Sequence, residues 1–299
     1  MREYLLNYLI ALRLHRRLHF INNKFMRILI PADFTDLSKR AAAYGAALAE
    51  KTGAEINLIH VHKPSVSRNN PVFTLEAEMN SDISKESGLQ LGEYYKELFH
   101  EPFSKITGIT RIGKTADEIV LEAARVTNSL IVMGTHSDGS IKQWINGSKT
   151  AEVIEKTDGP VLVIPSEGKA GIPGKIAFLT GCDSYDLVAI EKVVSLTNAL
   201  NAELFLVHIA PLNQNGDRQV FSNFCNRVKL QTGYEKIYSR IIKDEDVING
   251  IRRYTETHKP DLLAFNVRSK VLKKRLFQKP FPQLISTVTG LPLLIFHRP

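Results

Sequence analysis

The chain has 299 residues, enough for two domains of ordinary size, and its 43% hydrophobic and 23% charged content is typical of a soluble globular protein. The net charge is +8, and residues 1–25 hold +4 of it, with five basic residues and one acidic residue. The remaining +4 is too mild to indicate a nucleic-acid partner, and two cysteines without metal or disulfide spacing suit a reducing, cytoplasmic location.

The N-terminal segment 1–25 is predicted to be an extension outside the fold. Its apolar run from Tyr4 to Leu12 is far shorter than the roughly 20 residues that a membrane span needs. It also lacks the small-residue cleavage site of a signal peptide. The alternative is a helix lying on a membrane surface, because Leu5, Leu9 and Leu12 could share one face with arginines beyond them.

From residue 26 onward, short β-branched runs alternate with helical patterns. The apolar runs are continuous, which is typical of parallel strands covered by helices on both faces. Asp36 is expected to cap the first helix, and the spacing of Thr115 and Glu118 predicts a capping box at the third. Strands are expected near 27–31, 55–61, 105–111, 129–133 and 160–164, and helices near 36–52, 84–100, 115–127 and 148–157.

The sequence repeats itself. At an offset of 148, the motif RILIPAD from Arg27 is followed by KIAFLTG from Lys175, and EINLIHV from Glu55 by ELFLVHI from Glu203. At an offset of 132, LIVMGTHS from Leu130 is matched by LLAFNVRS from Leu262. Two constant offsets indicate one duplicated unit with a shorter middle loop in the second copy. The predicted domains are therefore 26–165 and 175–299, joined by the turn-rich linker 166–174.

A ligand site is expected where the strand order of such a sheet reverses. In a five-stranded sheet with order 3-2-1-4-5, this point lies between PADFTD, from Pro31, and MGTHSDG, from Met133. Gly134 permits close approach of the backbone, and Gly147 and Ser148 precede a helix whose first amides are unpaired. These features suit a phosphate, although Gly and Ser are also common in ordinary strand-to-helix turns.

The sequence resembles the universal stress protein A family in tandem form, over about residues 26–299. The opening MRILIPADFTD, from Met26, and the closing GSKTAEVIEKTDGPVLVIP, from Gly147, carry the resemblance. Nucleotide-binding members have a loop of Gly, two residues, Gly, nine residues, Gly, then Ser or Thr. The resemblance implies an α/β fold with two tandem Rossmann-like (adenine nucleotide alpha hydrolase-like) domains. Each domain is an open parallel five-stranded sheet of order 3-2-1-4-5, flanked by helices.

The same resemblance implies an ATP-type site, with Mg²⁺, in the first domain only. Ala32 and Asp33 would line the adenine and ribose side, and the backbone of Val61 would meet the adenine. The loop and helix start would surround the ribose and phosphates through Met133, Gly134, His136, Ser137, Gly147, Ser148 and Lys149.

One loop position departs from the family pattern. Ser137 replaces the second glycine, and positive φ there would cost about 1–3 kcal/mol, against about 8 kcal/mol for a micromolar site. The strain alone weakens binding without abolishing it.

The second copy has lost the pattern. Gly134 corresponds to Asn266, Gly147 to Lys279 and Ser148 to Pro280, so no nucleotide or other cofactor is expected there. The basic stretch 268–279 is interpreted as a solvated helix face, with an acidic partner or anionic lipid as the alternative.

Other reactive residues do not form a recognisable catalytic or metal site. His60, His62 and His208 end strands, and the recurrence of His60 at His208 favours a structural role. Asp33 with Asp36 could hold Mg²⁺ beside a nucleotide, but the capping role of Asp36 is simpler. The sequence has no Walker pattern and no nucleophile elbow.

The predicted function is that of a universal stress protein, a stress-response or regulatory module that is not an enzyme. The two domains are expected to form an internal pseudo-dimer through their final strands, and a homodimer is a further expectation. The alternatives are a nucleotide-independent protein-interaction module and, less favoured, a slow ATPase.

Overall fold

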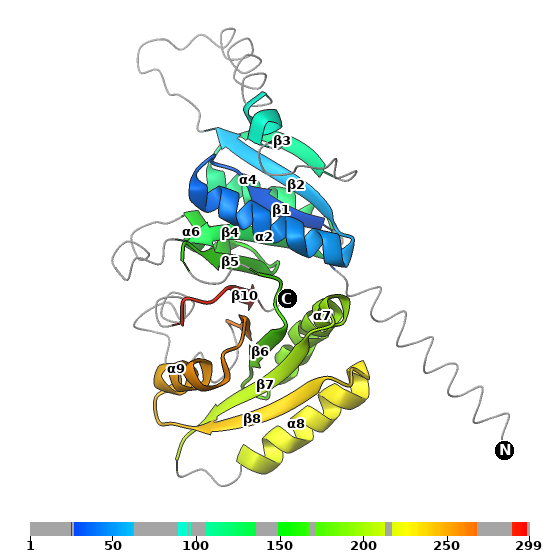
Figure 1. The fold of residues 1–299 in the computed structure, drawn as a ribbon, viewed down its shortest axis with the longest axis vertical. Helices are drawn as coiled ribbons and strands as arrows, with labels where there is room; N and C mark the ends of the chain where they lie inside the picture. Colours follow the sequence, from blue (N-terminus) through cyan, green and yellow to red (C-terminus); the bar gives the residue numbers. More distant parts are fainter. Residues whose placement is uncertain are drawn as a thin grey trace, which may run out of the picture. The chain divides into compact units, whose positions relative to one another are not determined.

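The computed structural model describes residues 25, 27–62, 89–94, 96, 106–135, 149–167, 171–212, 217–267 and 289–297 (Figure 1). The chain divides into two compact units, Met26–Ala170 and Gly171–Pro299, and the division falls within the stretch 166–174. The segment 1–24 lies outside the described residues. Phe25, which was expected outside the fold, is buried. No helix among the described residues is long and apolar enough to cross a membrane.

The first unit contains one parallel sheet with the order β3-β2-β1-β4-β5, which confirms the predicted fold class. Residues 89–94 and 96 are also helical, within the expected helix 84–100. The elements are β1 (Arg27–Pro31), α2 (Asp36–Thr52), β2 (Glu55–His62), β3 (Ile106–Ile112), α4 (Thr115–Ala124), β4 (Ser129–Thr135), α6 (Lys149–Lys156) and β5 (Val161–Pro165).

The second unit repeats this topology with the parallel order β8-β7-β6-β9-β10. The equivalence follows from the duplication, because β6 and β7 stand at the positions of β1 and β2 in the first copy. The elements are β6 (Lys175–Leu179), α7 (Ser184–Leu200), β7 (Glu203–Ala210), α8 (Asp217–Thr232), β8 (Ile237–Lys243), α9 (Val247–His258), β9 (Leu262–Asn266) and β10 (Leu293–Phe296).

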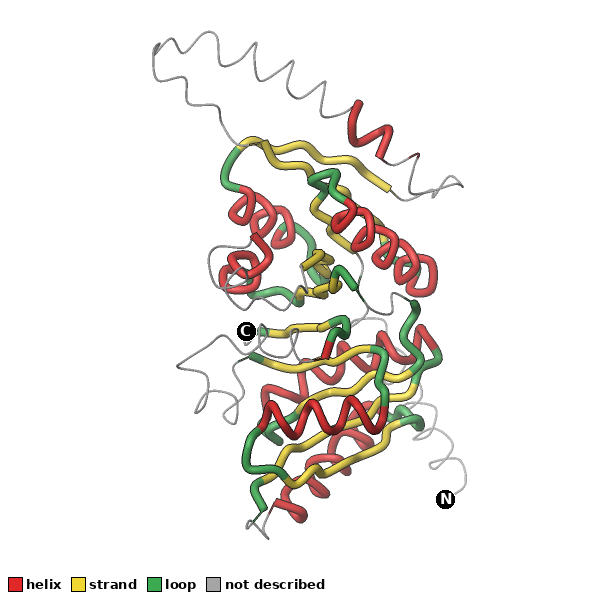
Figure 2. The backbone as a smooth tube through the Cα atoms, turned by 60° about the vertical axis from the view of Figure 1, so that its left-hand side comes forward, coloured by secondary structure: helices red, strands yellow, loops and turns green. Residues whose placement is uncertain are grey.

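Helices cover both faces of each sheet. In the first unit, α2 packs on one face, and α4 and α6 contact each other on the opposite face (Figure 2). In the second unit, α7 and α8 contact each other on one face of the sheet. The crossover through α9 returns in the opposite direction, from β8 to β9, and covers the other face. The strands β1, β4 and β5 are therefore buried almost throughout, which explains their continuous apolar sequences.

The helix starts differ from the two capping predictions. Thr35, and not Asp36, caps α2, and its side chain accepts a hydrogen bond from the Ser38 amide. The predicted capping box at Thr115 was wrong, because Lys114 occupies the cap position and makes no side-chain cap bond. Asp36 and Thr115 are instead the first residues of their helices, where a negative charge such as that of Asp36 still interacts favourably with the helix dipole.

A buried carboxylate fastens the C-terminal end of α4 to the sheet. The Glu122 side chain is 5% exposed and lies within salt-bridge distance of Arg27 (3.4 Å), Arg111 (2.7 Å) and Arg125 (3.1 Å). Arg27 begins β1 and Arg111 is in β3, so one carboxylate joins two strands to a helix. Three positive partners compensate for the cost of burying the charge.

We predict that Glu122→Gln lowers the free energy of unfolding by about 3–5 kcal/mol, because it leaves the buried Arg27 guanidinium without its counter-charge. Urea denaturation followed by circular dichroism measures the change. The matched control is Glu50→Gln, whose side chain is 64% exposed and which should cost under about 1 kcal/mol. Equal losses in the two variants would contradict the proposed clamp.

Candidate functional site

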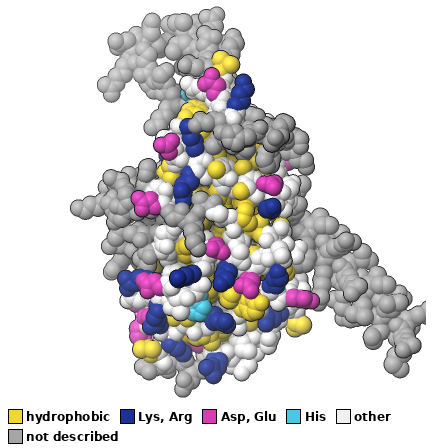
Figure 3. Space-filling view, viewed as in Figure 1, with side chains coloured by type: hydrophobic (Ala, Val, Ile, Leu, Met, Phe, Trp, Pro, Cys, Tyr) yellow, Lys and Arg dark blue, Asp and Glu magenta, His cyan; other side chains and the backbone are white. Residues whose placement is uncertain are grey.

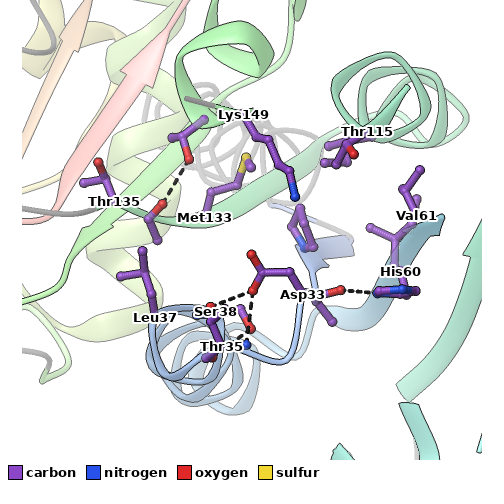
Figure 4. A pocket seen from close by; sticks show the side chains of 16 residues that line it. Asp33, Thr35, Leu37, Ser38, His60, Val61, Thr115, Met133, Thr135 and Lys149 are labelled. Atoms are coloured by element: carbon purple, nitrogen blue, oxygen red, sulfur yellow. Dashed lines mark hydrogen bonds between the residues drawn. The ribbon is translucent and has the colours of Figure 1, made fainter. Parts of the chain in front are cut away.

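The first unit contains a cavity of about 320 Å³ at the carboxyl ends of β1, β2 and β4 (Figure 4). This is the point where the strand order reverses, as the sequence predicted. The volume is near the lower end of the roughly 300–1,000 Å³ that is usual for ligand pockets. Six of the predicted site residues line the cavity: Ala32, Asp33, Val61, Met133, Gly134 and Lys149.

The remaining predicted site residues lie outside the described part of the chain. They are His136, Ser137, Gly147 and Ser148, so the phosphate-binding half of the site stays a prediction. The basic stretch 268–279 also lies outside the described residues, so its interpretation as a solvated helix face stays a prediction.

The loop after β1 presents a carboxylate to the cavity. Asp33 accepts hydrogen bonds from the Thr35 amide (3.2 Å) and hydroxyl (2.6 Å), and both bonds reach the same oxygen, Oδ1. Burial opposes ionisation of Asp33, but the bonds from Thr35 and the positive charge of Lys149 lower its pKa below the usual value. Asp33 is therefore an ionised acceptor at neutral pH.

The backbone of β2 has a free edge beside this loop. The β1–β2 ladder ends with Pro31 opposite Ile59, and Ala32 donates one last hydrogen bond to the Ile59 carbonyl. Residues two apart in a strand direct their amide groups to the same side, so Val61 points its N–H and C=O toward β1. Because β1 has already ended, these two groups face the cavity.

A histidine supports the turn in both units. The Nδ1 atom of His60 lies 2.6 Å from the Ala32 carbonyl oxygen, and that of His208 lies 2.9 Å from the Thr180 carbonyl oxygen. The two pairs correspond at the offset of 148, which confirms the structural role predicted for these histidines. Among the described residues, no group of three or more His, Cys, Asp or Glu side chains could hold a metal ion.

The start of α4 forms a wall that the sequence interpretation missed. Thr115 and Ile119 line the cavity from one face of this helix, one turn apart. The predicted site residues belong to the ends of the first, second and fourth strands and to the loop and helix after the fourth, and none belongs to the helix that follows the third. A signal was available, because α4 returns across the sheet from β3 to β4 and must begin at the carboxyl edge.

Gly134 serves packing as well as the cavity. A Cβ atom at this position would lie 2.5 Å from Leu37 Cγ and 2.8 Å from the Leu37 carbonyl oxygen. The start of α2 can therefore approach β4 only if residue 134 is glycine. Gly134 does not have a positive φ, so the predicted close approach of the backbone, and not an unusual φ, is what the glycine provides. Its carbonyl accepts a hydrogen bond from the Thr150 hydroxyl (2.9 Å), which positions α6.

Lys149 is the cation of the site. It is the first residue of α6, and its side chain extends into the cavity toward Asp33 (Figure 4). No hydrogen bond or ion pair joins Lys149 to another described residue, although its charge acts on Asp33. An ammonium group in this position favours a ligand that carries negative charge.

The second unit has a different structure at the corresponding position. Asp186, which replaces Ser38, is fully buried and accepts hydrogen bonds from the Thr180 hydroxyl (2.7 Å) and the Gly181 amide (2.9 Å). The other oxygen of Asp186, Oδ1, has no partner. Burial raises the pKa of Asp186 to about 7. An acid and a buried Asn266 thus stand where the first unit has Ser38 and Gly134.

A doubly wound α/β sheet with a polar cavity at its switch point defines a class of small-ligand-binding domain. The sequence matches the Universal stress protein family over residues 24–165. A universal stress protein of Methanocaldococcus jannaschii is 32% identical over 151 residues, which span 49% of this chain and 86% of that protein. The chain belongs to the universal stress protein family.

Two further comparisons agree. A universal stress protein of Bacillus subtilis is 29% identical over 147 residues, which cover 47% of this chain and 99% of that protein. The crystal structure of a universal stress protein from Archaeoglobus fulgidus has a TM-score of 0.66 and covers 93% of this chain and 98% of that chain. Its sequence identity is 16%, so this similarity shows the shared fold.

We predict that Gly134→Ala destabilises the first unit by about 1–3 kcal/mol, because the added methyl group displaces the backbone of α2 at Leu37. Thermal unfolding measures the effect. Gly92→Ala is the control, since a Cβ there meets nothing within 4 Å and the residue is helical. The control should be neutral or stabilising by up to about 1 kcal/mol, and a neutral Gly134→Ala would show that the close approach is unimportant.

We predict that the buried Asp186 makes the second unit less stable as the pH rises. Its folded pKa of about 7 exceeds the ordinary aspartate value of 3.8, so the folded state binds the extra proton. The contribution of protonated Asp186 to the free energy of unfolding is complete below pH 3.8. It decreases between pH 3.8 and pH 7, by about 1.4 kcal/mol per pH unit.

Urea denaturation at several pH values tests this dependence. Asp186→Asn should flatten the slope in that window, whereas Glu235→Gln, which changes an exposed carboxylate of the same unit, should not. An unchanged slope in Asp186→Asn would assign the dependence to another group.

Proposed function

We propose that the first unit binds an adenine nucleotide of the ATP type as a regulatory ligand, and that the second unit does not. The proposal rests on one observation: a backbone edge, an ionised carboxylate and an ammonium group face the same cavity, and neither the edge nor the ammonium is paired with another described residue. Val61, Asp33 and Lys149 supply these groups. Each can interact with a different part of a nucleotide.

The edge of Val61 suits a base. Its N–H and C=O provide a donor and an acceptor side by side, which match the ring nitrogen and the exocyclic amine of adenine. Ile59, Met133 and Ile119 supply apolar surface around it, as the faces of a flat ring require. Guanine would place its carbonyl oxygen against the Val61 carbonyl oxygen, which is unfavourable.

Asp33 and Lys149 suit the ribose and the phosphates. The second carboxylate oxygen of Asp33, Oδ2, makes none of the hydrogen bonds to Thr35, and a ribose hydroxyl can donate to it. Lys149 begins α6, where a phosphate also gains from the unpaired amides of the first turn. Any Mg²⁺ would arrive with ATP and be held mainly by its phosphates.

The nucleotide acts in this proposal as a ligand that shifts the conformations or partners of the protein, and not as a substrate. Among the described cavity residues, the histidine and the carboxylate have other roles in this proposal, because His60 contacts the Ala32 carbonyl oxygen and Asp33 binds the ribose. Charged side chains of both signs are interspersed on the described surface seen in Figure 3. That face therefore has no large patch of one charge that would indicate a ligand, and the proposal rests on the cavity.

Titration of the full-length protein with a fluorescent ATP analogue tests the proposal. Saturable binding is expected, and Lys149→Met should weaken it by about 10–100-fold, because a charge-assisted contact is lost. The matched control is Lys51→Met, at the last turn of α2, which should bind as the parent does. Ser137→Gly should strengthen binding if the family glycine is the better residue there.

Two outcomes would contradict the proposal. Absence of binding at millimolar ATP would favour a nucleotide-independent interaction module. Hydrolysis faster than about one turnover per minute would favour an enzyme, since typical turnover numbers begin near one per second and slow ATPases lie below them.

A further inference from the structure

We infer that the hydroxyl of Thr115 selects the base of the bound nucleotide by accepting a hydrogen bond from an exocyclic amine at the six-position of a purine. Thr115 would then be a specificity-determining residue of the site. The inference rests on the proposed nucleotide site in the first unit.

The chain holds Thr115 next to the end of β2. The Gly113 amide donates a hydrogen bond to the His62 carbonyl oxygen (2.9 Å), so the loop before α4 is tied to the residue that follows Val61. Two residues later, Thr115 begins α4 and lines the cavity. Figure 4 shows Thr115 on the same side of the cavity as Val61, and away from Met133 and Thr135.

The Thr115 hydroxyl is available to a ligand. Lys114 occupies the cap position of α4, and no side-chain hydrogen bond caps this helix. The Thr115 hydroxyl therefore makes no capping bond. No hydrogen bond joins the hydroxyl to another described residue, and the side chain is half-buried. A hydroxyl can both donate and accept a hydrogen bond, so it can bind either a donor or an acceptor group of the ligand.

The position of this hydroxyl matches the base and not the phosphates. In the proposed site the phosphates lie beside Lys149 and the start of α6, whereas Thr115 lines the cavity on the side of Val61 (Figure 4). The Val61 carbonyl can take one hydrogen of an amine, and the second hydrogen then needs another acceptor. Ile119, one turn further along α4, is fully buried and gives the wall an apolar floor beneath the hydroxyl. One polar group over an apolar surface suits a flat ring with a polar edge.

A comparison of two ligands and two variants isolates this hydrogen bond. ATP carries the six-amine, and purine riboside 5′-triphosphate lacks it. In the full-length protein, Thr115→Val removes the hydroxyl at nearly constant shape and should weaken ATP binding by about 5–10-fold. Its affinity for purine riboside 5′-triphosphate should stay unchanged. Thr115→Ser keeps the hydroxyl and should retain the parent preference for ATP.

Four results would overturn the inference. Thr115→Val could bind ATP as tightly as the parent, or lose affinity equally for both ligands, which would show that the hydroxyl does not contact the amine. Thr115→Ser could lose the preference although the hydroxyl remains. Failure of the parent to bind either triphosphate would refute the proposed function itself and this inference with it. The parent titration therefore separates the two failures, and circular dichroism shows whether each variant is folded.

Discussion

The early end of the β1–β2 ladder is the constraint on which the candidate site depends. Pro31 ends β1, Ala32 gives the last backbone bond to Ile59, and Phe34 turns the chain at a φ of 64° into α2. The longer strand β2 is thereby left with unpaired amide groups at Val61. A fully paired strand would have closed the gap, so the cavity exists because one strand is shorter than its neighbour.

The two duplicated units share one backbone arrangement but have different side chains at the switch point of the sheet. Phe34 and Cys182 occupy equivalent turn positions with nearly equal φ values, 64° and 63°, and a histidine contacts the carbonyl of the preceding loop in both units. The backbone has therefore been kept, while the side chains that face the switch point have changed. A buried acid, Asp186, stands in place of Ser38, and the buried Asn266 stands in place of Gly134.

Most of the fold and part of the site could be predicted from the sequence. Continuous apolar strands and the repeat predict two parallel sheets covered by helices on both faces, and the strand order 3-2-1-4-5 follows from the resemblance to the universal stress protein A family. The close approach predicted at Gly134 is present, but only the packed structure shows that Leu37 lies where a Cβ would be. Thr115 was assigned to a capping box because local spacing cannot show which residue takes the cap position. Contacts between distant segments, such as Glu122 with Arg27, leave no local pattern at all.

The buried contacts of Glu122 also determine how α4 can move. They tie the C-terminal end of this helix to Arg27 at the amino end of β1 and to Arg111 near the carboxyl end of β3, and the first turn of α4 lies at the carboxyl edge. Because these contacts fix the helix near Glu122, a displacement at Thr115 would tilt or bend α4 more easily than slide it along its axis. The contact between α4 and α6 would transmit such a tilt across that face of the domain. Occupancy of the cavity would then change the angle of a surface helix.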